Sequence, residues 1–585
     1  MSMPPRALGG MLGTTMLRSP PEPESEEINL YISTYYSLLR SSGEVRVRAF
    51  EEAHGYSGSS LHAGALADEP DLAAFAYAAA RLPDDMPDTD LIILGQSHEL
   101  FEAAGYDVRR WKIAKTRGRR RPLRVDGSGK LAVFIASASD IDDLVPIVTA
   151  YQIEWNKIHM RLRRVAPSPE AMVEATKDPV ALAAALGVPV ADAQKLLDAF
   201  GPARLERGGR ALYDRPLDLR IRMLAASYSQ YQRAAQRWWS GIEPAYVRPT
   251  EPRRPPVYFV SSNTHALANL VGGYARSYAD EIVAWARLRD PEGLGDEVAR
   301  LAALNDPTQL APVLYYLLRS YIHSDPGTTK MNEVRAFEAS KGLVHLSEPG
   351  HIDVDAQIAH LNELDPELLD PRLKMPGIER LKKSDAVLVN IDYPLGMAAY
   401  HLLSRLGQGV GEVRGIYIMG KAATLNGRVG DVMLSGNVYD EHSKNTFLFK
   451  NAFTARDVAP YLRHGSVFDN QKAVTVRSAF LQNKEYMDAF YSSGYTVLEM
   501  EAGPFLGATY ELVNPRRVPT DEVVHLSAHT PFDVGIVHYA SDTPYSRRQS
   551  LLSKSLSFFG VDATYACAIA IVRRVIELEI GRLAP

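Results

Sequence analysis

Two glutamates flank a methionine where an apolar strand is expected to turn into an apolar helix. The stretch VLEMEAGPFLGATYEL contains Glu499, Met500 and Glu501. Carboxylates at such a junction commonly accept hydrogen bonds from the first backbone N–H groups of the helix. A methionine wedged between two acids adds nothing to a cap. The residues therefore allow two interpretations, a helix cap or part of a ligand site.

Polar pairs also follow other apolar strands in the second half of the chain. In open α/β sheets, ligands bind outside the carboxyl ends of the strands, so residues at these positions are candidate site residues. Their repeated placement indicates one site at one edge of a sheet. The pairs are Ser262–Asn263, Asp392–Tyr393, Gly420–Lys421 and Ser541–Asp542.

The elements that must position these residues alternate between strand and helix after residue 257. Buried apolar strands such as VYFVSS and DAVLVNI are separated by helical stretches, which is typical of a mostly parallel sheet. In the first half we expect helices over 28–82, two strand–helix units beginning TDLIILG and KLAVFIAS, and a wholly helical region over 166–245. The fold class is therefore α/β.

With 585 residues the chain is too long for one ordinary core. Residues 1–27 are rich in Pro, Gly and Glu and are expected to form a flexible tail. We expect an N-terminal α/β and helical domain of unknown role over 28–247. The proline-rich RPTEPRRPP at 248–256 would be a linker, and residues 257–585 would form the C-terminal domain.

Composition excludes several classes of protein. A formal charge of −5 provides no general attraction to nucleic acid or to an anionic membrane. The single Cys567 excludes an intramolecular disulfide framework and a zinc site built from cysteines. No apolar run approaches the roughly 18–20 residues of a membrane span, and the N-terminus lacks the apolar stretch of a signal peptide. We expect a cytoplasmic protein without a membrane or nucleic-acid partner.

Three further patterns are interpreted as structural. The basic run KIAKTRGRRRPLR (112–124) could contact phosphate or RNA, but beyond Trp111 it lacks aromatic residues and is interpreted as a solvated hairpin. GQGVG (407–411) follows a helix and precedes a strand, the wrong order for dinucleotide binding. A histidine and aspartate group alternates along a hairpin, which places its members on different faces, so no metal site is expected there: His345, His351, Asp353, Asp355 and His360.

The second half resembles the nucleoside phosphorylase/nucleosidase superfamily, which contains purine nucleoside phosphorylase, methylthioadenosine nucleosidase and AMP nucleosidase. Four pieces match in order over residues 257–580. MGKAATLNGRVGDVMLS is similar to the glycine loop and the strand after it, and RSAFLQ to the segment whose aromatic residue packs on the base. VLEMEAG matches the Val-Glu-Met-Glu-Ala signature, and YASDTP resembles the final Ser-Asp strand. The resemblance implies a phosphorylase-type mixed, mostly parallel central sheet flanked by helices, and a homo-oligomer.

The resemblance also implies a role for each matching residue. Glu501 would hold the ribose hydroxyls, Met500 would pack beneath the sugar, and Glu499 would lie close to it. Phe480 would stack against the base, and Asp542 would be the general acid near the purine N7. An acid that protonates the departing base stabilises the transition state, an effect of about 10²–10⁴-fold. The remaining expected substrate contacts are Gly420, Ser541 and Ser262.

The sequence departs from the family pattern where phosphate would bind. The first loop reads SSNTHA, with Ala266 close to where the family has an arginine, and Ile418 occupies the place of a second arginine. Lys421 replaces a small serine and could bind phosphate, or the phosphate of a nucleotide, as a point charge. Alternatively water attacks, with His265 as a candidate base, and the protein is a nucleosidase.

We therefore expect metal-free cleavage of the N-glycosidic bond of a purine nucleoside or nucleotide, by phosphorolysis or hydrolysis. No cofactor is expected beyond inorganic phosphate as a co-substrate, and the expected partners are this small molecule and further copies of the chain. Two alternatives stay open. Each site residue taken alone could be a cap, a core residue or a turn former. The domain could also be a catalytically inactive sensor or assembly module that binds a nucleoside or nucleotide.

Overall fold

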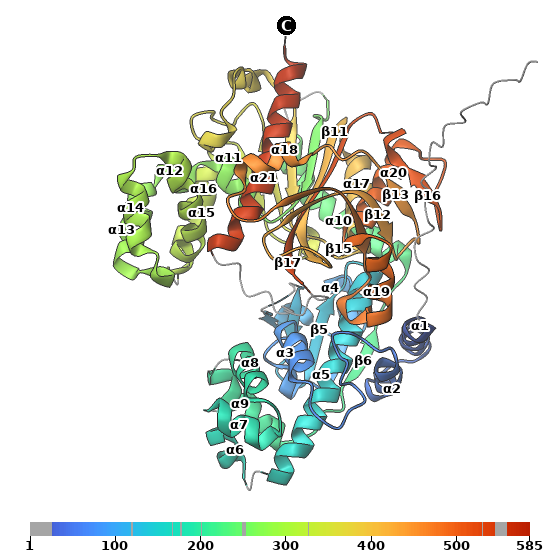
Figure 1. Cartoon of the computed structure of the whole chain (residues 1–585). Helices are drawn as coiled ribbons and strands as arrows, with labels where there is room; N and C mark the ends of the chain where they lie inside the picture. Colours follow the sequence, from blue (N-terminus) through green and yellow to red (C-terminus); the bar gives the residue numbers. More distant parts are fainter. Residues whose placement is uncertain are drawn as a thin grey trace, which may run out of the picture.

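The computed structural model describes residues 26–584, except 117, 119–120, 166–167, 176–177, 201, 249–252, 326, 529 and 544–557. The described residues form two α/β units, each built around its own sheet (Figure 1). The small unit contains a six-stranded sheet and the large unit an eleven-stranded sheet. The α/β class, with mixed sheets flanked by helices, is therefore confirmed.

The sheet of the small unit has the strand order β1–β6–β2–β5–β4–β3. β6, β2 and β5 run parallel, and β2 is buried along its whole length, so it requires cover on both faces. β3 and β4 form an antiparallel hairpin, as expected for the basic run. The strands are β1 (Val45–Arg46), β2 (Leu91–Gly95), β3 (Lys112–Ala114), β4 (Leu123–Val125), β5 (Lys130–Phe134) and β6 (Arg220–Met223).

The helices of the small unit pack on this sheet and extend beyond it. The longest, α5 (Ala138–Val165), starts where the carboxylate of Asp140 accepts backbone hydrogen bonds from Ala136 (2.7 Å) and Ser137 (3.2 Å). These bonds fix the path from β5 into the helix. The others are α1 (Glu26–Ser41), α2 (Arg48–Tyr56), α3 (Leu72–Ala80), α4 (His98–Ala103), α6 (Pro169–Ala175), α7 (Pro179–Leu186), α8 (Val190–Phe200) and α9 (Pro202–Asp214).

The prediction of a wholly helical region over 166–245 is wrong at one point. The strand β6 lies between α9 and α10 (Tyr228–Tyr246) and pairs with β1 and β2. Four residues are too few to show a clear period. A strand this short is stabilised by hydrogen bonds to strands distant in the chain, so its own sequence does not predict it.

The sheet of the large unit has the order β16–β13–β12–β14–β15–β11–β7–β10–β9–β8, and β17 pairs with both β11 and β12. These pairings close β12, β14, β15, β11 and β17 into a ring. The strands are β7 (Val257–Ser261), β8 (Leu343–Leu346), β9 (Ala356–His360), β10 (Val387–Ile391), β11 (Val413–Thr424), β12 (Val432–Asp440), β13 (Thr446–Leu448), β14 (Val467–Thr475), β15 (Tyr495–Glu499), β16 (Val523–His525) and β17 (Asp533–Asp542).

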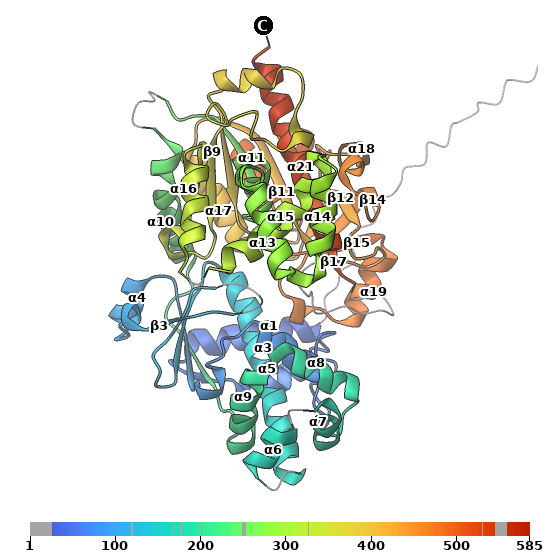
Figure 2. The ribbon, with the colours of Figure 1, turned by 90° about the vertical axis from the view of Figure 1, so that its left-hand side faces the viewer.

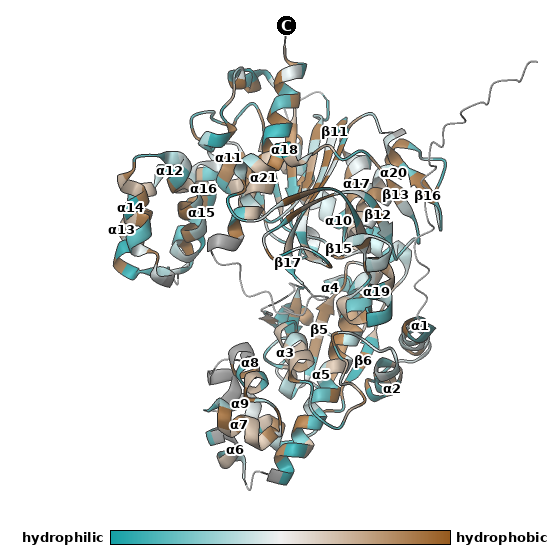
Figure 3. Cartoon of the chain, viewed as in Figure 1, coloured by the Kyte–Doolittle hydropathy of each residue, from teal (hydrophilic) through white to brown (hydrophobic). Residues whose placement is uncertain are grey.

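Alternating residues of β7 enter two different cores. Tyr258 and Val260 pack in a core with α11, α15 and α21, whereas Val257 and Phe259 pack in a core with α10, α17 and α20. A strand directs successive side chains to opposite faces, so helices cover both faces of the sheet. Figure 3 shows apolar residues concentrated on the strands. The helices after α10 are α11 (Ala266–Gly272), α12 (Tyr274–Ser277), α13 (Ala279–Arg289), α14 (Gly295–Ala303), α15 (Pro307–His323), α16 (Thr329–Ala339), α17 (Met397–Gly409), α18 (Ala455–Val458), α19 (Lys484–Ser492), α20 (Ala502–Val513) and α21 (Phe558–Arg582).

The small unit lies at one end of the large unit (Figure 2). The hydroxyl of Ser139, at the start of α5, lies 3.0 Å from Nε2 of His442 and accepts a hydrogen bond of 2.9 Å from the backbone N–H of Met397. In sequence these contacts join residues more than 250 positions apart. α10, which precedes the proline-rich stretch, packs in the core of the large unit.

Two expected segments lie partly outside the described residues, namely 1–25 of the flexible tail and 249–252 of the linker. Glu26 and Glu27 begin α1 and so belong to a helix. Within the described parts of the chain, no helix combines the length and the apolar character that a membrane crossing requires.

Candidate functional site

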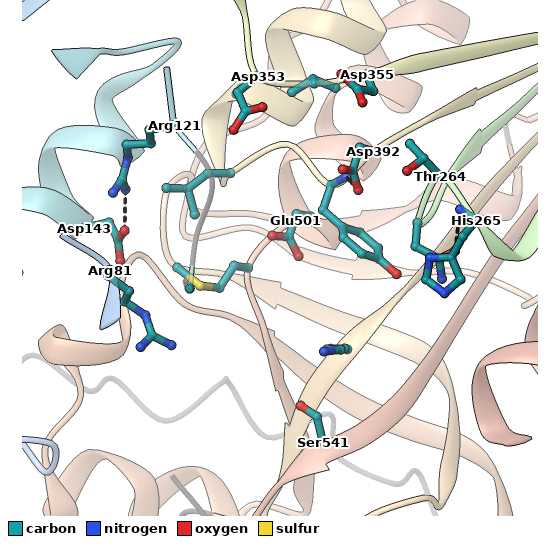
Figure 4. Close-up of a pocket in the computed structure, with 18 of the residues that line it drawn as sticks. Arg81, Arg121, Asp143, Thr264, His265, Asp353, Asp355, Asp392, Glu501 and Ser541 are labelled. Carbon is teal, nitrogen blue, oxygen red and sulfur yellow. Dashed lines mark hydrogen bonds and ion pairs between the residues drawn. The ribbon is translucent and has the colours of Figure 1, made fainter. Parts of the chain in front are cut away.

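A cavity of about 1710 Å³ lies between the two units. The large unit contributes residues from the loops and strand ends after β7, β10, β15 and β17, and the small unit contributes residues from α3, β5 and α5. Figure 4 shows side chains from both units directed toward this space. The predicted site residues that line it are Glu499, Met500, Glu501, Lys421, Ser541, Asp542 and His265.

Asp542 is the last residue of β17, and only one of its two carboxylate oxygens accepts a hydrogen bond from a described residue. The hydroxyl of Ser541 donates a hydrogen bond of 2.7 Å to Oδ2. Oδ1 is buried and has no hydrogen-bond partner among the described residues. Burial raises the pKa of Asp542 above its usual value, while the hydrogen bond from Ser541 and the charges of Lys421 and Arg81 oppose the increase. A carboxyl group in this setting is suited to hold a proton and deliver it to a ligand.

Lys421 lies within β11, opposite Tyr539 of β17, and its side chain is exposed toward the cavity. The resemblance implied a glycine loop here, but the strand continues to Thr424, so Gly420 and Lys421 belong to a strand. Desolvation of its ammonium group lowers the pKa of Lys421, and the carboxylate of Asp542 opposes this change. No ion pair within 4 Å joins Lys421 to another described residue, so its charge is available to an anionic ligand.

Glu499 holds the start of α20. Its Oε2 accepts hydrogen bonds of 2.7 Å from the backbone N–H groups of Glu501 and Ala502, and its Oε1 accepts one from the hydroxyl of Thr475. Burial, reinforced by the nearby charge of Glu501, raises the pKa of Glu499 to about 8. The first acid of Glu-Met-Glu therefore has the bonding pattern of a helix cap.

Glu501 and Met500 have a different environment. Glu501 immediately precedes α20 but makes no capping hydrogen bond with its side chain. The carboxylate is half-buried and extends into the cavity, as Figure 4 shows. Met500 packs against a small core that contains Leu498 and also lines the cavity. The second acid and the methionine thus face the ligand space, whereas Glu499 serves the helix.

Three of the predicted substrate contacts are placed away from the cavity wall. Ser262 is fully buried and donates a hydrogen bond of 2.7 Å to Oδ1 of Asn390, which ties the end of β7 to β10. Phe480 is 1% exposed and packs in the core of the small unit, with its ring 5.3 Å from the ring of Tyr77. Gly420 lies in β11, where an added Cβ would approach no atom closer than 3.6 Å. We therefore do not assign ligand contacts to these three residues.

The structure also brings Tyr393 and two arginines into the cavity. Tyr393 was a strand-end candidate without an assigned role, and the two arginines were not predicted. Tyr393, after β10, has its hydroxyl 3.3 Å from the hydroxyl of Tyr539, and burial raises its pKa. Its position at a strand end was a usable signal. Arg81 at the end of α3 and Arg319 on α15 come from segments without any motif, so no sequence signal indicated them.

The histidine and aspartate group at 345–360 is divided among separate contacts. His345 is bonded through Nε2 to Glu338 at 2.5 Å and through Nδ1 to Gln357 at 3.1 Å. His360 lies 3.1 Å from the carbonyl oxygen of Ala245. In the described parts of the chain, no group of three or more His, Cys, Asp or Glu side chains is arranged to hold a metal ion.

The chain belongs to a family of unknown function, DUF6909, whose model matches residues 47–577. No protein of curated function matches the sequence. Among solved structures, it is similar to a protein from Weissella paramesenteroides described as a methylthioadenosine nucleosidase, with 13% identity, a TM-score of 0.26, and coverage of 42% of this chain and 92% of that one. A methylthioadenosine phosphorylase from an antarctic soil metagenomic library matches with 7% identity, a TM-score of 0.24, and coverage of 34% and 74%. The uridine phosphorylase of Schistosoma mansoni matches with 13% identity, a TM-score of 0.23, and coverage of 33% and 72%.

Proposed function

We propose that the cavity binds a purine nucleoside or nucleotide and that the protein cleaves its N-glycosidic bond. The observation that carries this proposal is the carboxyl group of Asp542, whose Oδ1 is buried without a partner among the described residues, in the same cavity as Glu501 and Lys421. These three side chains come from β17, the start of α20 and β11, and they provide an acid, an acceptor for hydroxyl groups and a positive charge.

In the proposed reaction the bond between C1′ of the sugar and N9 of the base breaks, and both electrons leave with the base. The proton of Asp542 passes to N7 of the base, which neutralises the departing group. Glu501 accepts hydrogen bonds from the ribose hydroxyls and positions the sugar for attack. Because burial raises the pKa of Asp542, the acid retains its proton at a higher pH than an exposed aspartate would.

The nucleophile that forms the new bond to C1′ is either water or phosphate. Lys421 supports phosphate, because it is a cation facing the cavity without an ion-pair partner among the described residues. His265 supports water, because it is exposed at the same cavity and is a candidate base. The phosphate dependence of base release separates these two reactions.

Chromatography of released base tests the proposal. The purified protein is incubated with adenosine, guanosine, inosine, methylthioadenosine, AMP and ATP, each with and without phosphate. Asp542→Asn and a matched control, Asp296→Asn on the exposed surface of α14, are assayed in parallel. Release by the wild-type and control proteins, with strong loss in Asp542→Asn, is the expected result. Equal release by both variants would contradict the role of Asp542.

A second candidate function is favoured by the placement of Phe480. The aromatic side chain predicted to stack on the base is packed in the core of the small unit, so the cavity lacks that contact. A protein that binds a nucleoside or nucleotide without cleaving it, as a sensor, would fit this arrangement. Saturable binding of a nucleoside to a folded protein that releases no base would favour this second function.

A further inference from the structure

The cavity lies at the carboxyl edges of both sheets. In the small unit, Gln96 follows β2 and Ala136 follows β5, two parallel neighbours, and both residues line the cavity. In the large unit, Tyr393 follows β10 and Asp542 ends β17, and both also line it. Ligands of α/β sheets bind at this edge. The small unit therefore presents its own ligand-binding edge to the same space as the large unit.

Five basic side chains that line the cavity have no ion pair within 4 Å among the described residues: Arg81, Arg319, Arg335, Lys421 and Lys484. A sixth, Arg121, is different. It is buried, with its guanidinium 3.1 Å from Asp140 and in contact with Asp143, so its charge is already balanced. The cavity thus presents cations that form no close ion pair with the described residues, beside carboxylates such as Asp542 and Glu501.

Three of these cations line the cavity from different elements: Arg81 from the end of α3, Arg319 from α15 and Lys421 from β11. Arg81 and Lys421 both act electrostatically on Asp542, and Arg319 acts on Lys421. Like charges repel at short range, and an anion between them would stabilise all three. A phosphate group fits this requirement, since arginine forks bind its oxygens in pairs and lysine binds it as a point charge.

Arg81 is held in a defined position on the wall of the small unit. Its guanidinium lies 3.4 Å from the centre of the Tyr77 ring, and its Nη1 donates a hydrogen bond of 3.1 Å to the carbonyl oxygen of Tyr77. Figure 4 shows the side chain extending from this wall toward the cavity. A cation placed in advance loses little conformational freedom when it binds an anion.

We propose that Arg81 of the small unit, together with Arg319 and Lys421 of the large unit, binds a phosphate group of the ligand, so that both units form one binding site. This inference deepens the proposed function, and it rests on that function only for the nucleoside part of the ligand. The phosphate group belongs either to a 5′-nucleotide or to inorganic phosphate.

Binding is measured by titration calorimetry on the full chain, so that turnover is not needed for a result. The probes are AMP, adenosine, and inorganic phosphate in the presence of adenosine. The Asp542→Asn protein is used for the titrations if the wild type releases base. Tighter binding of AMP than of adenosine identifies a nucleotide as the source of the phosphate group, whereas saturable binding of phosphate beside adenosine identifies the free anion.

Arg81→Gln and Arg319→Gln are the test variants, and Arg456→Gln, at an exposed position of α18 outside the cavity lining, is the matched control. Hydrogen bonds to charged groups predict a loss of about 10- to 100-fold in affinity for the phosphate-bearing probe in each test variant, with adenosine binding unchanged. Circular dichroism confirms that each variant is folded. Equal affinity of the wild type for AMP and adenosine, without phosphate binding, would overturn the inference, as would unchanged affinity in both test variants.

The two proposals fail in distinguishable ways. Arg81-dependent binding of AMP or phosphate without base release would leave this inference standing and contradict the enzymatic function. Base release that is insensitive to both Arg81→Gln and Arg319→Gln would overturn this inference and leave the enzymatic function standing.

Discussion

Lys421 and Asp542 lie on the paired strands β11 and β17, and the charge of each opposes the pKa change that burial imposes on the other. Burial disfavours the charged form of both groups, so it lowers the pKa of the lysine and raises that of the aspartate. The two side chains therefore act as a coupled pair at the end of the cavity where the leaving base is proposed to be protonated.

This coupling predicts a shift in the pH dependence of base release. Lys421→Met removes a positive charge that lowers the pKa of Asp542, so the pKa of Asp542 rises further. A general acid must be protonated, and activity falls as the pH rises through its pKa. We expect the descending limb of kcat/KM against pH to move to higher pH in Lys421→Met, whatever its maximal rate. A limb that moves to lower pH would contradict the coupling.

Ser541→Ala tests the same acid without altering a cavity charge. The hydroxyl of Ser541 donates to Oδ2 of Asp542 at 2.7 Å and stabilises the ionised form. Its removal raises the pKa of Asp542, so the descending limb should again move to higher pH. The measurement is the same pH profile, with Asp296→Asn as a control that leaves the profile unchanged.

Asp542→Asn removes the transferable proton while it keeps the shape of the side chain. We expect base release to fall by about 10²–10⁴-fold, the usual contribution of general acid catalysis. Binding of the ligand should remain, because Glu501 and Lys421 are unchanged. Single-turnover measurements of released base check this result, and a loss below tenfold would indicate that another group protonates the base.

Glu499 and Glu501 should separate stability from ligand binding. Glu499 has a folded-state pKa of about 8 against an ordinary value of 4.5, so it contributes stability that is present below 4.5 and lost as the pH rises toward 8. Glu499→Gln should remove this pH dependence from the free energy of unfolding between these two values, as measured by urea titration. Glu501→Gln should instead raise KM and keep most of that pH dependence, because burial is the larger cause of the raised pKa of Glu499 and the charge of Glu501 the smaller one. A higher KM in Glu499→Gln, with the pH dependence of its stability unchanged, would place Glu499 in the ligand site.

Phe480→Ala is expected to affect the stability of the protein. The side chain is 1% exposed in the core of the small unit, and removal of a buried phenylalanine costs about 3–5 kcal/mol. The midpoint of urea unfolding should fall accordingly. A variant that keeps its stability and has a higher KM for the nucleoside would restore the interpretation of Phe480 as a base-stacking residue.

Local patterns in the chain predicted much of the fold. The alternation of strand and helix after residue 257 and the hairpin in the basic run are present in the structure. Both depend on short-range periodicity and turn residues, which neighbouring positions determine. Motif order likewise brought Glu501, Lys421 and Asp542 into consideration, and the structure places all three at one cavity.

The sequence by itself indicated most of the residues that stand at strand ends, because hydrophobic periodicity marks where a strand stops, although β11 continues past Lys421 to Thr424. Only the tertiary structure decided which of them share a space. It made Glu499 the cap of α20 and placed the side chain of Glu501 in the cavity. It also buried Phe480 in the core of the small unit. It also brought Arg81 to Asp542 across more than 450 residues of chain. The physical reason is that these choices depend on contacts between segments distant in the chain, within the large unit and between the two units, and no local pattern records those contacts.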